Sequence, residues 1–365
     1  MVTDSRRSCT SEFAAYAAPR QVPSANWFGG DAKQRAGTLC GTRHTDSSKP
    51  MPTTSSRALL SLLILSLGCG STANVPAEQP PTEAPSARVL ETVPDIDQEV
   101  VTRTFGEVRI HTLVSRADRV GTATHVFEGP TGLVVLDTHL LRRDARALRA
   151  YVDAIGKPVE RVIISHGHPD HYFGLEYFDD LPTYALAESI AHMRRRWRGH
   201  RSGHVARIGD EITDFARFPA HEQMPGRETL AGIEFDFESV ANAEDVTQLV
   251  VRLPGHDVLA VQDLSTQGYH PFVGTLRLRA WRGVLSRLIE ETRDSEDAYV
   301  LVGHGPPGTA ALLEGTRAYL PVAEEVIAAE PATQEEFVET MKTRFPDLEG
   351  DLVLPISARF VVPGH

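Results

Sequence analysis

Cysteine is scarce in this 365-residue sequence and is confined to one end of it. The three cysteines are Cys9, Cys40 and Cys69, so no thiol follows residue 69. The remainder of the chain therefore cannot form a disulfide, a cysteine-based zinc site or a thiolate nucleophile. The sequence also lacks a Gly-x-Ser-x-Gly segment, which excludes the nucleophile elbow of many serine hydrolases.

Positive charge is the second shortage. The chain carries 37 Lys and Arg residues against 49 Asp and Glu residues, a net charge of -12 at pH 7. Nucleic-acid binding without sequence preference requires clustered positive charge, so we expect no nucleic-acid partner. The one basic run, residues 194–198, is expected to form the solvated face of a helix.

The apolar segment at residues 58–67 has about ten residues and is too short to span a bilayer as a helix. A mildly basic lead, residues 51–57, precedes this segment, and Gly68-Cys69-Gly70 follows it. That order resembles a bacterial secretory signal that ends in a lipoprotein-type cysteine.

This resemblance predicts an exported protein on the periplasmic side. Its expected parts are residues 1–50, either disordered or an extension upstream of a true start at Met51; a signal peptide over 51–69; a flexible Pro-rich tether over 70–100; and a folded domain over 101–365. Lipidation of Cys69 would anchor the protein to a membrane, provided that more than one acyl chain is attached.

Metal-binding side chains are concentrated in residues 165–171, Ser-His-Gly-His-Pro-Asp-His, after an apolar run that predicts a buried strand. His166 and His168 lie two residues apart, so in an extended segment they point to the same side. Asp170 and His171 follow a proline, where the chain must turn, and can face a second metal. Imidazole and carboxylate are ligands that zinc, manganese and iron bind. A histidine-rich polar turn is the alternative, and this ligand pattern makes it the weaker one.

The pattern His-x-His-x-Asp-His after an apolar strand resembles the signature of the metallo-β-lactamase-fold hydrolases, from about residue 108 to the C-terminus. Residues 258–263 resemble the family's strand that ends in a metal-bridging aspartate, here Asp263. A strand followed by Gly-His-Gly at residues 303–305 resembles its last histidine ligand, and residues 132–138 resemble its early strand and Asp-Thr turn. The resemblance implies an α/β fold, an αββα sandwich.

The sequence departs from the family at one ligand. The family usually supplies a third histidine to the first metal from a turn before a strand, but residues 241–247 contain no histidine. Alignment of the next strand and Asp263 places Glu244 at that position, with Asn242 and Asp245 as neighbours that could substitute. A carboxylate can bind zinc, so the site can persist with a harder ligand.

The resemblance implies two zinc ions, with iron or manganese as alternatives. The implied ligands are His166, His168 and Glu244 for one metal, Asp170, His171 and His304 for the other, and Asp263 as the bridge. Two such metals would generate hydroxide from a shared water. The hydroxide would then attack an ester, thioester, lactone or lactam of a small-molecule substrate. Asp170 could also pass a proton to the leaving group.

Two other functions stay open. Some proteins of this fold hold a single iron and oxidise a sulfur substrate, and a weakened first site would fit that chemistry. A lipoprotein that keeps the fold as a non-catalytic binding module is the second.

The alternation of strands and helices also predicts layered α/β architecture. Helices are expected over residues 141–155, ended by Gly156, and over 185–198, 276–293, 309–329 and 333–344, with a break at Pro321. Residues 181–232 and 267–278 are expected to form the pocket walls. His192, His200 and His204 show no ligand pattern and are expected to be surface or core histidines.

Overall fold

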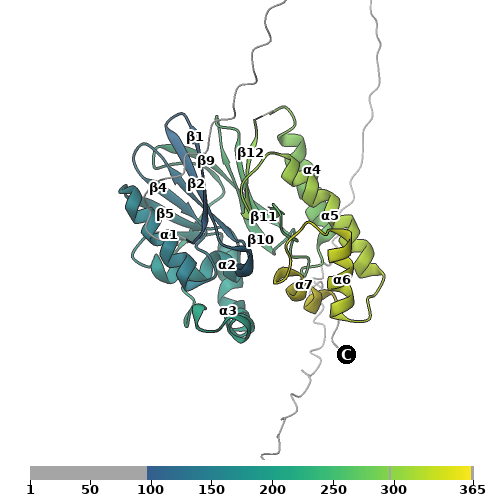
Figure 1. The fold of residues 1–365 in the computed structure, drawn as a ribbon. Helices are drawn as coiled ribbons and strands as arrows, with labels where there is room; N and C mark the ends of the chain where they lie inside the picture. The colour runs from purple at the N-terminus through teal and green to yellow at the C-terminus, as the bar shows by residue number, and fades with distance from the viewer. Residues whose placement is uncertain (1–96, 296, 363–365) are drawn as a thin grey trace, which may run out of the picture. The chain divides into compact units, whose positions relative to one another are not determined.

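The computed structural model describes residues 97–295 and 297–362. The predicted signal peptide, Cys69 and residues 70–96 of the predicted tether lie outside them. The last tether residues, 97–100, are described, and a strand begins there at Glu99. Two β-sheets pack face to face, and helices cover the outer face of each (Figure 1). This arrangement confirms the αββα sandwich expected from the sequence.

The first sheet contains seven strands in sequence order. They are β1 (Glu99–Phe105), β2 (Val108–Val114), β3 (Ala123–Glu128), β4 (Leu133–Leu136), β5 (Val159–Ile164), β6 (Thr183–Ala185) and β7 (His221–Glu222). Strands β1 to β4 pair antiparallel, whereas β4 to β7 pair parallel. The parallel half needs crossover connections, which is why helices interrupt this part of the chain.

The second sheet contains five strands. In spatial order they are β12 (Tyr299–His304), β11 (Val258–Thr266), β10 (Thr247–Leu253), β9 (Ile233–Ala241) and β8 (Gly226–Leu230). Only the β11–β12 pair is parallel.

Strand β4 shows why these segments are apolar on both faces. Val134 and Leu136 point into the core between the two sheets, where they join residues of the second sheet. Leu133 and Val135 point to the opposite face, where they pack with a helix. Successive side chains of a strand alternate between faces, so a sheet covered on both sides requires a continuous apolar run.

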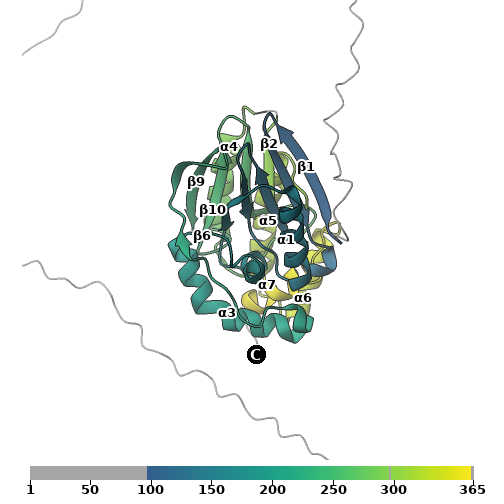
Figure 2. The same ribbon diagram turned by 90° about the vertical axis from the view of Figure 1, so that its left-hand side faces the viewer.

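In the part of the chain that the structure describes, seven α-helices complete the sandwich. They are α1 (Arg142–Ile155), α2 (Pro169–Tyr172), α3 (Ala187–Ile208), α4 (Leu278–Glu291), α5 (Ala311–Ala328), α6 (Gln334–Arg344) and α7 (Val353–Val361), with 3-10 turns at Ala117–Arg119, Phe173–Tyr177 and Gly209–Glu211. Helices α1 and α3 contribute to the core outside the first sheet, and α4 to α7 to the core outside the second. Helix α3 lies below the strand ends in Figures 1 and 2.

Three details correct or extend the predicted helices. Gly156 ends α1 in a left-handed conformation, as expected, with a φ of 76°. The predicted break at Pro321 is wrong, because α5 continues through it. Pro321 and Arg317, whose carbonyl loses a partner, are exposed, so water can satisfy that carbonyl. Helix α3 continues ten residues beyond the predicted end at residue 198, and α7 was not predicted.

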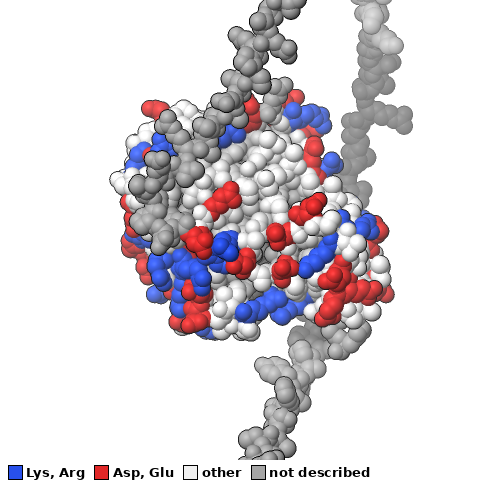
Figure 3. Space-filling model, viewed as in Figure 1, with Lys and Arg blue, Asp and Glu red and all other residues white. Residues whose placement is uncertain are grey.

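On the face shown in Figure 3, basic and acidic side chains intermingle over the lower half, around the helices at the strand ends. Within residues 97–295 and 297–362, no helix combines the length and the apolar character that crossing a membrane requires.

Candidate metal centre

The seven predicted ligands lie at one end of the sandwich, where segments of both sheets meet. His166 and His168 follow β5, Asp170 and His171 belong to α2, Glu244 lies in the β9–β10 turn, Asp263 lies in β11, and His304 ends β12. Two isolated bridges, His166 to Gln248 and Thr122 to His304, join the two sheets there. Residues up to 138 positions apart in the chain therefore converge, from His166 to His304.

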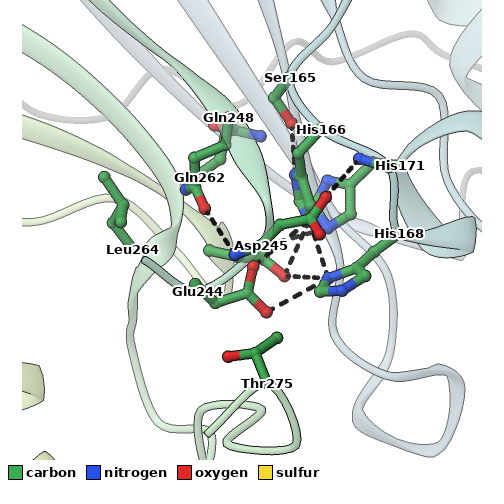
Figure 4. A network of polar contacts seen from close by, with 12 residues as sticks. Ser165, His166, His168, His171, Glu244, Asp245, Gln248, Gln262, Leu264 and Thr275 are labelled. Atoms are coloured by element: carbon green, nitrogen blue, oxygen red, sulfur yellow. Dashed lines mark hydrogen bonds and ion pairs between the residues drawn. The ribbon is translucent and has the colours of Figure 1, made fainter. Parts of the chain in front are cut away.

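The first ligand group consists of His166, His168, Glu244 and Asp263, whose candidate ligand atoms lie within 4.8 Å of one another. His168 Nδ1 lies 3.2 Å from Glu244 Oε1, and His166 Nε2 lies 3.8 Å from Glu244 Oε2. Figure 4 shows the Glu244 carboxylate directed toward both imidazoles. Glu244 therefore lies within reach of both imidazoles of this group.

The two neighbours of Glu244 that could have substituted for it lie elsewhere. Asn242 is exposed, with a φ of 56°. Asp245 is buried but engaged, because its Oδ2 accepts a hydrogen bond from the Gly167 backbone N–H and its Oδ1 lies 3.1 Å from His192 Nδ1. Neither is part of the ligand group.

The second group consists of Asp170, His171 and His304. Asp170 Oδ2 lies 3.3 Å from His304 Nε2 and 3.6 Å from His171 Nε2. Asp263 reaches this group as well, with its Oδ1 3.1 Å from His171 Nε2 and its Oδ2 3.3 Å from His304 Nε2. Asp263 is thus the one carboxylate that lies between the two groups.

Unsatisfied polar atoms show that these residues fit a metal. Both Glu244 oxygens, Asp263 Oδ1 and His171 Nε2 are buried and have no hydrogen-bond partner among the described residues. A buried polar atom without a partner costs roughly 1–3 kcal/mol. All of these atoms belong to ligand-type groups that face one another, so divalent ions would satisfy them together.

Protons on the imidazoles balance the carboxylates of this cluster. Burial favours neutral His168, but the Glu244 and Asp263 carboxylates outweigh it and raise the His168 pKa well above its usual value. The same opposition raises the His171 pKa, chiefly through Asp263 and Asp170. Burial alone would raise the Asp263 pKa, but His171 and His304 hold it well below its usual value. Metal binding would release these protons, because ligands must be deprotonated.

Asp137, which was not among the predicted site residues, orients two of the candidate ligands. Its Oδ2 lies 2.7 Å from His171 Nδ1 and accepts a hydrogen bond from Ser165 Oγ at 2.8 Å. Ser165 Oγ in turn lies 2.9 Å from His166 Nδ1. A carboxylate on Nδ1 keeps the proton there and leaves His171 Nε2 free to face a metal. The Asp-Thr turn after an apolar strand was the sequence signal for this role.

Replacement of Asp137 by asparagine is expected to weaken metal affinity or kcat/KM about 10- to 100-fold, because the orienting carboxylate is lost. Chelator competition and steady-state kinetics would measure the two effects. Asp257→Asn is a matched control, since Asp257 is exposed and shares a positive φ, 49° against 67° for Asp137. Equal metal affinity in the two variants would contradict this role for Asp137.

Backbone strain lies beside the ligands. Asp137, His139 and Gln262 adopt positive φ values of 67°, 68° and 44°, which are uncommon for residues other than glycine. At Gln262 the pairing of β11 with β12 skips a residue, so β11 bulges immediately before Asp263. Bulges re-aim side chains next to functional sites. The Gln262 side chain also donates to Asp137 Oδ2 at 2.5 Å, which links the bulge to the ligand-orienting carboxylate.

A cavity of about 270 Å³ opens onto both ligand groups, with His168, Asp170, Asp263 and His304 in its lining. Its walls come from α3, from residues 266–277 and from α7. The first two walls match the predicted segments except at Thr266, which lies one residue before the second segment, whereas α7 was not expected there. A larger cavity, about 830 Å³, lies near Arg116 and Glu349 and contains none of the seven candidate ligands.

Four side chains of α3 line the small cavity: His192, Arg196, His200 and His204. As expected from the lack of a ligand pattern, none of these three histidines belongs to a ligand group, but the structure places all three in the cavity wall. Their spacing of four residues was the available signal, because residues four apart share one helix face. Arg196, in the basic run predicted to be the solvated face of a helix, is exposed on α3 and also lines this cavity.

Comparison with known sequences gives one family and one curated relative. The family model described as the metallo-beta-lactamase superfamily matches residues 117–304. An (R)-specific secondary-alkylsulfatase from a Pseudomonas species is 24% identical over 216 residues, 48% of this chain and 33% of that protein. The chain thus spans about a third of the length of the curated relative it matches.

Among solved structures similar to this chain is a metallo-beta-lactamase from Pontibacter korlensis. It is 19% identical, the match covers 61% of this chain and 99% of that one, and the TM-score is 0.47. FIM-1 from Pseudomonas aeruginosa, in a mono-zinc form, is 16% identical over 63% of this chain and 97% of that one, with a TM-score of 0.47. A double mutant of the sec-alkyl sulfatase PisA1 is 18% identical over 72% of this chain and 49% of that one, with a TM-score of 0.48.

Proposed function

Because the chain belongs to the metallo-beta-lactamase superfamily and carries two ligand groups at the floor of one cavity, we propose that it is a metal-dependent hydrolase of small molecules. The position of Asp263 carries the proposal. Its Oδ2 lies 3.5 Å from His166 Nε2 in the first group and 3.3 Å from His304 Nε2 in the second, which is the arrangement that a shared pair of metal ions requires.

Zinc is the proposed metal. Four imidazoles and three carboxylates form the donor set, which suits zinc, and manganese or iron are the alternatives. When bound, two such ions lower the pKa of a water to near neutrality and stabilise negative charge on the group that is attacked. An ester, thioester, lactone or lactam is the proposed type of substrate.

The chain's own residues would position the substrate and move the proton. Asp170 lines the cavity and accepts a hydrogen bond from Thr122 Oγ1 at 3.3 Å, which fixes its carboxylate beside the reacting group. From that place the Asp170 carboxylate can take up the proton that the attacking water loses and pass it to the leaving group. The buried walls around the site exclude bulk water from the ligand groups, which strengthens every electrostatic interaction among them.

Metal content in the purified full chain tests this proposal, with Glu244→Ala beside it. We expect two zinc ions per chain and about one in the variant, because the first group loses its only carboxylate besides the shared Asp263. Glu222→Ala is the control, since Glu222 is exposed on β7. Hydrolysis of a panel that contains a nitrophenyl ester, a thioester, a lactone and a β-lactam would then identify the chemistry.

Other outcomes would direct the work elsewhere. One iron per chain, unchanged in Glu244→Ala, would favour oxidation of a sulfur substrate by a single metal. No bound metal after reconstitution would overturn both enzymatic functions and leave a binding module. A secondary alkyl sulfate belongs in the panel because the curated relative is a secondary-alkylsulfatase and arginines line the cavity.

A further inference from the structure

The cavity over the ligand groups has a basic wall. Arg196 on α3 and Arg277, just before α4, both contribute to its lining. Arg196 is exposed and Arg277 is half-buried. Their charges are permanent at any physiological pH. This wall stands out in a chain whose net charge is -12.

The carboxylates that line the cavity already have partners within the chain. Asp170 and Asp263 belong to the two ligand groups. Asp245 pairs with His192, at 3.1 Å between Oδ1 and Nδ1. Among the described residues neither Arg196 nor Arg277 forms an ion pair, so both can pair with a charge that enters the cavity from outside.

Two imidazoles in the same lining offer unused nitrogen atoms. His200 Nδ1 and His270 Nε2 are buried and lack a hydrogen-bond partner among the described residues. The Tyr319 hydroxyl lies 2.9 Å from His270 Nδ1 and can donate to it, which leaves the His270 proton on Nε2. Burial lowers the pKa of His270 to about 4, so this group is a neutral donor at pH 7. Such a donor suits a ligand rich in acceptor oxygens.

Much of the remaining lining is apolar. Phe272 contributes from the segment after β11, and Val353, Ile356 and Phe360 contribute from α7. Phe360 is 50% exposed, although it packs edge-on against Phe272. Exposed aromatic side chains beside a cavity commonly contact ligands. The apolar wall and the basic wall thus meet at one cavity.

We propose that this cavity binds a substrate with an anionic group on an apolar body, and that Arg196 and Arg277 determine this specificity. The inference rests on the proposed hydrolase function and names its substrate class. Carboxylate, sulfate and phosphate share the required chemistry. The anion is either the group that is cleaved or a second group on a carboxylic ester.

Binding to the full-length, zinc-loaded protein tests this anion subsite, defined by Arg196 and Arg277, without turnover. Calorimetry with octane-1-sulfonate, octanoate and octan-1-ol is expected to show that the two anions bind at least about tenfold more tightly than the alcohol. Arg196→Gln and Arg277→Gln should each weaken anion binding about tenfold. Arg195→Gln is the matched control, because Arg195 is exposed on the same helix and does not line the cavity.

Kinetics would separate the two sources of the anion. With a neutral nitrophenyl butyrate and an anionic mononitrophenyl glutarate, Arg196→Gln should raise KM about tenfold for the glutarate only, if the anion is a second group. Faster turnover of octyl sulfate, lost in the same variant, would identify the cleaved group as the anion. Either result supports the subsite.

Three results would overturn it: octan-1-ol binds as tightly as octane-1-sulfonate, Arg195→Gln and Arg196→Gln lose equal affinity, or anion binding depends on metal and on neither arginine. Arginine-dependent anion binding in a protein that hydrolyses no member of the panel would support the subsite and refute the hydrolase.

Discussion

Asp263→Asn is expected to lower kcat/KM by at least about 10³-fold, because a bridging ligand supports several kcal/mol of transition-state stabilisation. The Asp263 carboxylate reaches His166 Nε2 at 3.5 Å on one side and His304 Nε2 at 3.3 Å on the other. An amide has the same shape but lacks the negative charge that two cations share. We therefore expect bound metal to fall below two per chain while the fold persists.

Metal analysis, thermal unfolding and steady-state kinetics on one preparation would measure this effect. Asp347→Asn is the control, because Asp347 is exposed and belongs to neither ligand group. An Asp263→Asn protein with two metals and nearly full activity would show that the carboxylate is not shared between the sites.

Gly303→Ala is the second prediction with a large effect, and it alters no ligand. A Cβ added at Gly303 would lie 1.8 Å from Asp263 Oδ1 and 2.9 Å from the Asp263 backbone nitrogen. Both separations are shorter than real contacts, so the carboxylate must rotate away and β12 must also shift. Displacement of about 1 Å in a catalytic group can cost 10²-fold in rate. We expect a loss of about that size, with weaker metal binding and lower thermal stability.

Two comparisons separate this clash from a general effect of alanine. Gly283→Ala is the first, because its added Cβ on α4 meets nothing within 4 Å. That change should be neutral or slightly stabilising, since alanine favours helices. The second places Gly303→Ala on an Asp263→Ala background, where the clash with the side chain is absent. Its stability cost should shrink there, and an unchanged cost would mean that the backbone contact alone matters.

Local features of this chain could be predicted because they depend on neighbours in sequence. The apolar run at residues 159–164 forms β5, and Gly156 ends α1. Strand and helix periods act over a few residues, so composition and spacing suffice to reveal them. Pro321 shows the limit, because its effect on α5 depends on whether the freed carbonyl reaches solvent.

The candidate site also combines residues that the sequence alone revealed with residues that it did not. The spacing of His166, His168, Asp170 and His171 is a property of one short segment, and it was visible in the sequence. The proximity of Glu244 to that segment followed only from a resemblance, and the structure places its Oε1 3.2 Å from His168 Nδ1.

Tertiary structure alone brought together Asp137 and Gln262, which are 125 residues apart and share a hydrogen bond. It alone turned the α3 face with Arg196 and His200 toward the cavity, opposite a helix that the sequence did not predict. Such contacts form when sheets and helices bury their apolar faces against each other, and many sequences satisfy that burial. The chain therefore specifies by itself which metal ligands it carries, whereas the packing of the two sheets decides which other side chains meet them.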